Sequence, residues 1–141
     1  MGVSYKNIEG YSDPVPYEAL KDTGDYKHKY RPLAYICSPF SGDVEKNIKK
    51  ARGYSRFAVD NGVIPIAPHL LLPQYLDEAT ERDLAIFMDI VLLTKCKELW
   101  VFGEDVSAGM QIEIDQAEKR NLKIKYFTED LMEVKNEANI I

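Results

Sequence analysis

The sequence predicts one α/β domain, flavodoxin-like or Rossmann-like, with a parallel sheet of four to five strands flanked by helices. Short apolar runs alternate with amphipathic segments between Leu33 and Phe127, and glycine, proline or asparagine separates many of them. This alternation indicates right-handed crossovers that place helices on both faces of the sheet. We therefore divide the 141 residues into an irregular N-terminal arm, 1–32, and one domain, 33–141.

Four segments have the apolar, β-branched or aromatic character of strands. They are Leu33–Cys37, Val63–Ala67, Lys97–Gly103 and Leu122–Phe127. Pro65 cannot donate a backbone hydrogen bond, so the second strand is expected at an edge or to be irregular. The alternation of apolar residues with lysine in the fourth predicts another edge.

Helices are predicted over about 44–61, 78–96 and 107–121. Asp43 is positioned to cap the first of these helices. The second has apolar residues at three- and four-residue steps over most of its length, so we expect it to be largely buried. A short helix at 17–22 and an acidic C-terminal helix or tail are also expected.

Composition restricts the possible partners. Asp and Glu outnumber Lys and Arg by 23 to 18, with no basic stripe, so duplex nucleic acid is not an expected ligand. Cys37 and Cys96 are expected to be reduced core thiols. The sequence contains no leader or membrane-span pattern and no recognisable cofactor or metal motif. We therefore expect a cytoplasmic protein with no cofactor and no membrane partner.

A ligand is expected beyond the carboxyl ends of the strands, where the loops 38–43, 68–74 and 103–107 meet. The backbone amides of the first loop could hold an anion at the start of a helix. Its glycine is equally consistent with a purely geometric role in the turn. The predicted ligand-binding residues are Ser38, Pro39, Phe40, Ser41, Gly42, His69, Ser107 and Gly109.

Glu113, Asp83 and Tyr35 are the candidate catalytic residues. Glu113 lies early in a helix near the ligand end of the sheet and beside its packed stripe. Each residue also has an ordinary structural explanation: Glu113 and Asp83 as solvated acids that complement a helix dipole, and Tyr35 as a core side chain. His69 likewise has a surface or capping role as its alternative.

Three ordered motifs resemble those of the nucleoside 2-deoxyribosyltransferase superfamily. They are Tyr35-Ile-Cys-Ser-Pro-Phe-Ser-Gly42, Glu81-Arg-Asp-Leu84 and Ser107-Ala-Gly-Met-Gln-Ile-Glu-Ile-Asp-Gln-Ala117. The superfamily includes deoxynucleoside 5'-monophosphate N-glycosidases and many uncharacterised phage and bacterial members. The resemblance spans roughly 33–127 and leaves the arm outside it.

The resemblance implies a role for each matched residue. Glu113 corresponds to the nucleophile that attacks the anomeric carbon, Asp83 to the assisting acid and Tyr35 to a tyrosine in the site. Ser107 corresponds to a phosphate-binding serine. This chain departs from the family in having Ser41 and no arginine in the first motif. About six additional residues also separate Asp83 from Ser107.

The resemblance implies cleavage or transfer at the N-glycosidic bond of a nucleoside, a nucleotide or a related small molecule. Relatives of this kind are commonly homodimers or larger homo-oligomers. Non-catalytic binding of a nucleotide-derived ligand in the same cleft is the main alternative. A third possibility is an assembly module in which the tyrosine-rich arm docks on a neighbouring subunit.

Overall fold

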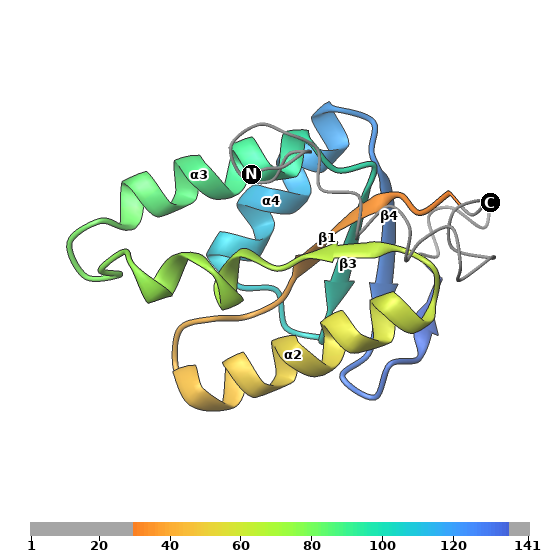
Figure 1. Ribbon diagram of the computed structural model, residues 1–141, viewed down its shortest axis with the longest axis horizontal. Coiled ribbons are helices and arrows are strands. Elements are labelled where there is room, and N and C mark those ends of the chain that lie inside the picture. Colours follow the sequence, from red (N-terminus) through yellow and green to blue (C-terminus); the bar gives the residue numbers. More distant parts are fainter. Residues whose placement is uncertain (1–29, 136–141) are drawn as a thin grey trace, which may run out of the picture. The chain divides into compact units, whose positions relative to one another are not determined.

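A five-stranded mixed sheet forms the centre of the part of the protein described by the computed structural model, residues 30–135 (Figure 1). The strands are β1 Leu33–Cys37, β2 Ile64–Ile66, β3 Glu98–Phe102, β4 Lys123–Phe127 and β5 Glu133–Val134. Their order across the sheet is β2-β1-β3-β4-β5, with β5 antiparallel to β4 and the other pairs parallel. The α/β prediction is confirmed. Residues 1–29 of the expected arm, with the helix at 17–22, lie outside the described residues.

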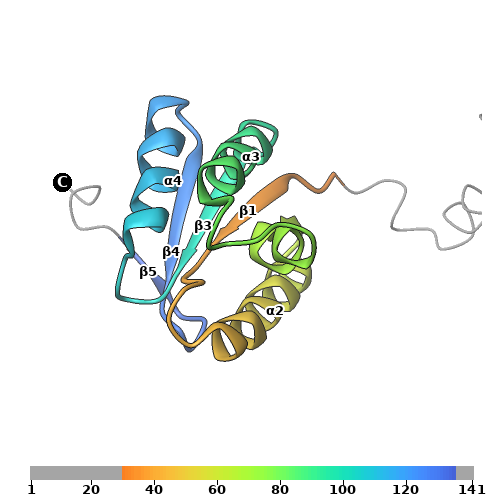
Figure 2. The same ribbon diagram turned by 90° about the vertical axis from the view of Figure 1, so that its left-hand side faces the viewer.

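Three α-helices connect the parallel strands. They are α2 Val44–Asp60, α3 Arg82–Thr94 and α4 Ala108–Lys119. Figure 2 shows α3 and α4 on one face of the sheet and α2 on the other. Two short 3-10 helices, η2 Pro68–Leu70 and η3 Leu72–Gln74, lie between β2 and α3.

Side chains of β1 alternate between the two faces of the sheet, as strand geometry requires. Tyr35 and Cys37 belong to the core cluster that includes Leu93 of α3 and Met110 of α4. Their neighbours on the strand belong to the other cluster, which includes residues of α2. The register of β1 therefore directs a tyrosine hydroxyl and a thiol toward the layer formed by α3 and α4.

Aromatic rings fill the core on the α2 face. Tyr54 stacks on Phe102 with ring centroids 4.3 Å apart, and Phe102 stacks on Phe127 at 5.0 Å. Phe57 packs against Phe127 edge-on at 5.2 Å. Such pairs add to the stabilisation that burial of the rings already supplies. The α2 face is thus a packed apolar layer, and titratable groups gather on the opposite face.

The two edges of the sheet differ in how well the sequence predicted them. β2 is an edge strand, as Pro65 indicated. The prediction that Leu122–Phe127 forms an edge was wrong, because β5 pairs with β4 where the sequence suggested an acidic helix or tail. β5 reaches only Tyr126 and Phe127, so the first half of β4 has no outer neighbour among the described strands. The lysines that suggested an edge lie in that half.

The helices begin and end close to the predicted positions except for α3, which starts at Arg82. Asp43 caps α2 by accepting a hydrogen bond from the Lys46 amide at 3.2 Å, as expected. The expectation that the second helix is largely buried was wrong. Only Ala85 and Leu93 of α3 are buried, because the three- and four-residue steps place a second set of apolar side chains on its outer face.

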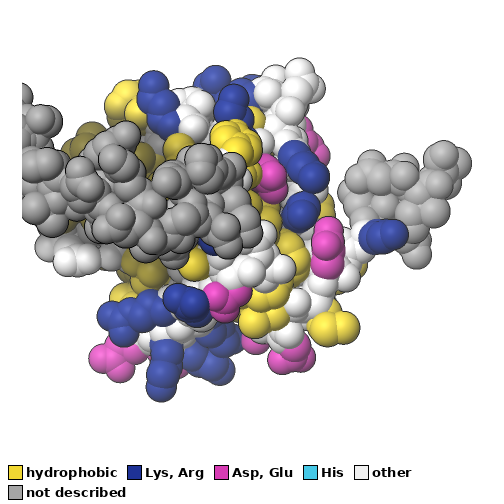
Figure 3. Space-filling view, turned by 45° about the vertical axis from the view of Figure 1, so that its right-hand side comes forward, with side chains coloured by type: hydrophobic (Ala, Val, Ile, Leu, Met, Phe, Trp, Pro, Cys, Tyr) yellow, Lys and Arg dark blue, Asp and Glu magenta, His cyan; other side chains and the backbone are white. Residues whose placement is uncertain are grey.

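Charged groups of both signs lie interspersed on the face shown in Figure 3, with apolar side chains between them. Both cysteines are buried and free, which confirms the prediction for Cys37 and Cys96. Among residues 30–135, no helix has the length and apolar character needed to cross a bilayer.

Candidate functional site

A pocket that is open to solvent lies at the carboxyl end of β1 between α3 and α4. We call it the central pocket. The lining residues come from the β1–α2 loop, η2, α3 and the start of α4. They are Ser38, Phe40, Ser41, His69, Glu78, Arg82, Ala85, Ile86, Asp89, Ile90, Ser107, Ala108, Gly109, Met110, Ile112 and Glu113.

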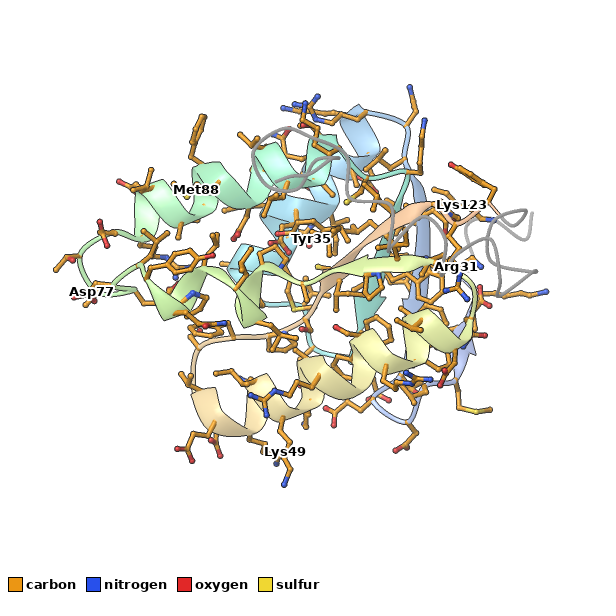
Figure 4. The ribbon with its side chains drawn as sticks, viewed as in Figure 1. Arg31, Tyr35, Lys49, Asp77, Met88 and Lys123 are labelled. Carbon is orange, nitrogen blue, oxygen red and sulfur yellow. The ribbon has the colours of Figure 1, made fainter. Side chains whose placement is uncertain are left out.

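Glu113 lies at the floor of the central pocket and is only 5% exposed. It shares the inward face of α4 with Met110, Ile114 and Ala117, which occur at three- and four-residue spacing. The Tyr35 hydroxyl donates a hydrogen bond of 2.5 Å to Glu113 Oε2. Figure 4 shows Tyr35 in the interior of the domain. Strand β1 and helix α4 together therefore fix the orientation of this carboxyl group.

Burial raises the pKa of Glu113 to about 7. The hydrogen bond from Tyr35 and the nearby thiol of Cys37 oppose this shift because they stabilise the carboxylate, and the charge of Asp89 adds to it. The same burial, together with the charge of Glu113, raises the pKa values of Tyr35 and Cys37, so both remain donors near neutral pH. Glu113 thus exchanges its proton in the range where most enzymes work.

Asp89 is the second carboxyl group in the central pocket with a raised pKa. It projects from α3, and burial brings its pKa to about 7, with a further contribution from the charge of Glu78. The pocket therefore holds two carboxyl groups that can each be charged or neutral at pH 7. Enzymes that cleave glycosidic bonds use such a pair, one as general acid and the other as nucleophile or base.

Two polar atoms of the pocket have no hydrogen-bond partner within residues 30–135: Ser38 Oγ and Glu113 Oε1. Ser38 is 1% exposed and follows β1 directly, where the strand ends at the pocket. Leaving a buried polar atom unpaired costs about 1 to 3 kcal/mol, so folded proteins normally avoid it. Both residues line the central pocket, so a hydrogen-bonding ligand there is one way to supply the missing partners.

Helix α4 begins at the mouth of the pocket. Ser107 caps it by accepting a hydrogen bond from the Met110 amide at 3.2 Å. Arg82 Nη2 lies 4.0 Å from the position that a Cβ atom would take at Gly109, so the guanidinium stands beside the positive end of the helix dipole. Arg82 also forms an ion pair with Glu78, in which Nη1 lies 3.6 Å from Oε1, a long distance for such a contact. Among the described lining residues, Arg82 is the only Lys or Arg.

His69 and Phe40 form an aromatic wall, with ring centroids 5.0 Å apart. Burial lowers the pKa of His69, although its hydrogen bond with the Ser38 backbone acts in the opposite direction. The imidazole is therefore neutral at pH 7 and offers a flat surface for a ring or a hydrogen bond.

The structure brings most of the predicted site residues together and leaves a few outside the central pocket. Ser38, Phe40, Ser41, His69, Ser107, Gly109 and Glu113 line it, and Tyr35 reaches it through Glu113. Pro39 lines a separate hollow. Gly42 lies outside the lining and has a φ of 96°, which favours glycine in this turn for geometric reasons. Asp83 is exposed and lines another hollow at the start of α3.

Sequence reasoning missed Asp89 and Arg82. Asp83 and Asp89 are six residues apart, so about one and two-thirds turns of helix separate the two side chains and direct them to different sides of α3. The sequence did contain one signal for Asp89. About six more residues separate Asp83 from the Ser107 motif than in the resembled superfamily, and Asp89 lies six residues closer to that motif. Arg82 supplies a cation that the first motif lacks, and no pattern within that motif indicated it.

No metal-binding group of three or more His, Cys, Asp or Glu side chains occurs within residues 30–135. The fold and the pocket thus define an α/β domain with a pocket lined by two carboxyl groups of raised pKa. A family model described as "Domain of unknown function (DUF7768)" matches residues 32–127, and the chain belongs to that family. A search among curated proteins gave no significant match.

Replacement of Glu113 by Gln is expected to stabilise the protein at alkaline pH. Because the folded-state pKa of Glu113 is about 7 and an unfolded glutamate titrates near 4.3, the folded state loses stability as pH rises from about 5 through 7. The variant avoids this loss and should gain roughly 2 to 4 kcal/mol relative to wild type between pH 5 and pH 8. Urea unfolding at the two pH values measures the change.

Glu118→Gln is the matched control for this stability test, since Glu118 is an exposed glutamate of the same helix. It should show no such gain. Equal effects of pH on Glu113→Gln and wild type would contradict the buried, proton-exchanging state of Glu113.

Proposed function

We propose that this domain cleaves or transfers the N-glycosidic bond of a nucleoside or nucleotide, with Glu113 as nucleophile. The observation that carries the proposal is the state of the Glu113 carboxyl group. One oxygen is held by Tyr35 at 2.5 Å, the other is buried and unpaired within the described residues, and the residue lines the central pocket. The resemblance of three motifs to the nucleoside 2-deoxyribosyltransferase superfamily supports the same reaction class.

The first step forms a bond between Glu113 Oε1 and the anomeric carbon while the bond from that carbon to the base breaks. The transition state has oxocarbenium character, which a carboxylate on one face of the sugar stabilises. Tyr35 holds Oε2 and leaves Oε1 to react. Water then cleaves the glycosyl ester in a hydrolase, whereas a second base does so in a transferase.

Asp89 is our candidate for the acid that protonates the departing base. It lines the central pocket, and its raised pKa of about 7 allows it to carry a proton at neutral pH. Asp83, to which the motif comparison assigned this role, faces a different hollow. The two aspartates of α3 can be distinguished by experiment.

The central test is release of free base from a panel of nucleosides, nucleotides and NAD-like compounds, followed by mass spectrometry. Wild type should release base from at least one class, and Glu113→Gln should lose activity by at least about a thousandfold because no bond to the sugar can form. Asp89→Asn should lose about a hundredfold or more, as expected for removal of a general acid. Asp83→Asn is the matched control and should retain activity.

The outcomes of this assay separate three readings. Loss in Asp83→Asn with activity retained in Asp89→Asn would return the acid role to Asp83. Ligands that bind and are recovered intact from wild type would contradict catalysis and favour a non-catalytic binding module. Base release that survives Glu113→Gln in folded protein would refute the nucleophile.

The pH dependence of kcat/KM should be a narrow bell centred near pH 7. Glu113 must be ionised, which sets the acid limb, and Asp89 must be protonated, which sets the basic limb. Tyr35→Phe removes a hydrogen bond that lowers the pKa of Glu113, so the acid limb should move to higher pH. Initial rates between pH 5 and pH 9 measure both limbs. An acid limb that moves to lower pH in Tyr35→Phe would contradict this assignment.

Arg82 favours substrates that carry a phosphate. It is the only Lys or Arg among the described lining residues and lies beside the amino end of α4, where anions bind well. Arg82→Ala should raise KM for nucleotides by about tenfold or more, since a charge-assisted hydrogen bond contributes about 1.5 to 3 kcal/mol. KM for nucleosides should change little. Arg56→Ala, on the outer side of α2, is the control, and equal effects on the two substrate classes would argue against a phosphate contact.

A further inference from the structure

Three side chains of alternating charge follow one another along the pocket side of α3. They are Glu78, Arg82 and Asp89, and all three line the central pocket. Arg82 and Asp89 are seven residues apart, which is close to two full helical turns, so both project from the same side of α3. Glu78 lies four residues before Arg82, in the turn that leads into the helix. Arg82 is exposed, whereas Asp89 is half-buried.

The contact between Arg82 and Glu78 is loose. The Nη1 and Oε1 atoms are 3.6 Å apart, longer than a charge-assisted hydrogen bond, and the two side chains are 54% and 37% exposed. Exposed ion pairs of this kind contribute little to stability, so Arg82 can leave Glu78 for a stronger partner.

A phosphate at the start of α4 is such a partner for Arg82. Its Nη2 atom already lies beside Gly109, 4.0 Å from the position that a Cβ atom would take there. A phosphate oxygen at this point would accept charge-assisted hydrogen bonds from the guanidinium and would lie at the positive end of the helix dipole. The guanidinium therefore has two competing anionic partners in one pocket, Glu78 and the ligand.

The charge of Glu78 also acts on Asp89. Burial is the main cause of the raised pKa of Asp89, which is about 7, and the Glu78 carboxylate is the second cause. The other charged or titratable groups around Asp89 come from α3, α4, β1 and η2. They are Arg82, Glu113, Tyr35, Cys37 and His69. Because His69 is neutral at pH 7 and the tyrosine and the thiol keep their protons, Glu78 and Glu113 are the acids that act on Asp89.

We propose that Glu78 holds Arg82 while the central pocket is empty, and that a substrate phosphate takes Arg82 over and leaves Glu78 to act on Asp89 alone. Phosphate binding then favours the protonated form of Asp89, and the charge of the phosphate acts in the same direction. The inference rests on the proposed function, in which Asp89 is the general acid, and makes Glu78 a positioning residue. By linkage, protonation of Asp89 strengthens phosphate binding by the same factor.

Carbon-13 NMR of the side-chain carboxyl groups, on the full chain, tests the coupling without any reaction. The probe is ribose 5-phosphate, which has no base to lose, and ribose at the same concentration is the uncharged comparison. The titration midpoint of Asp89, assigned with Asp89→Asn, should be higher by about half a pH unit or more with ribose 5-phosphate. Glu78→Gln should reduce this difference by roughly half, whereas Glu78→Asp keeps the charge and should preserve it.

Removal of Glu78 should also strengthen phosphate binding, because Arg82 no longer has to leave a partner. Calorimetry at pH 6 should give a dissociation constant for ribose 5-phosphate that is about twofold to fivefold lower in Glu78→Gln than in wild type. In the base-release assay the same variant should combine a lower KM for nucleotides with a lower kcat above pH 8. General damage to the fold would not change the two constants in this way.

Glu104→Gln is the matched control for these measurements. Glu104 is exposed at the same end of the sheet but lines the separate hollow beside Pro39, so its loss should leave the midpoint of Asp89 and the affinity unchanged.

Three results would overturn the proposal. They are an equal displacement of the Asp89 midpoint in wild type and Glu78→Gln, an unchanged affinity in Glu78→Gln, and ribose 5-phosphate that binds no more tightly than ribose. The binding experiments separate this inference from the reaction on which it rests. Coupling in a protein that releases no base would contradict the proposed function alone, and base release without coupling would contradict only the role of Glu78.

Discussion

The hydrogen bond between Tyr35 and Glu113 depends on how side chains alternate between the two faces of the sheet along β1. The rest of the site depends on that bond. Because successive residues of a strand face opposite sides, β1 directs Tyr35 and Cys37 toward α4 and the apolar side chains between them toward α2. A shift of register by one residue would place the donors in the aromatic layer and leave Glu113 without them. The packing of the sheet and the chemistry of the pocket therefore share one constraint.

Much of the fold could be predicted because its signals are local. The strand ends, the cap at Asp43 and the edge position caused by Pro65 each follow from a few adjacent residues. The direction in which a helical side chain points does not follow from adjacent residues alone. It depends on where the helix starts and on which side of the helix meets the sheet. For this reason the sequence suggested that Asp83 faces the pocket, which Asp89 lines instead, and it suggested a buried α3. β5 is only two residues long and has too little pattern to be recognised.

The central pocket combines features that oppose stability. A carboxyl group is enclosed where its charge is disfavoured, and two buried oxygens lack partners among residues 30–135. Folded proteins tolerate such features chiefly where a ligand or a reaction makes use of them. The opposite face of the sheet shows the contrast, because aromatic rings fill it and it holds no carboxyl group of this kind. One face is a packed apolar layer, and the other contains the pocket with its buried carboxyl group.

The short pairing between β4 and β5 has a consequence for how the protein behaves among its neighbours. Beyond the two residues that β5 covers, the outer backbone groups of β4 have no strand partner within residues 30–135, and an extended segment of another chain could join them there. Lys123 is exposed at this opening, and the ammonium group of Lys125 lies 5.2 Å from the Trp100 ring centre. An incoming strand would have to displace or desolvate these cations. The lysines therefore act as gatekeepers against amyloid-like growth from this edge.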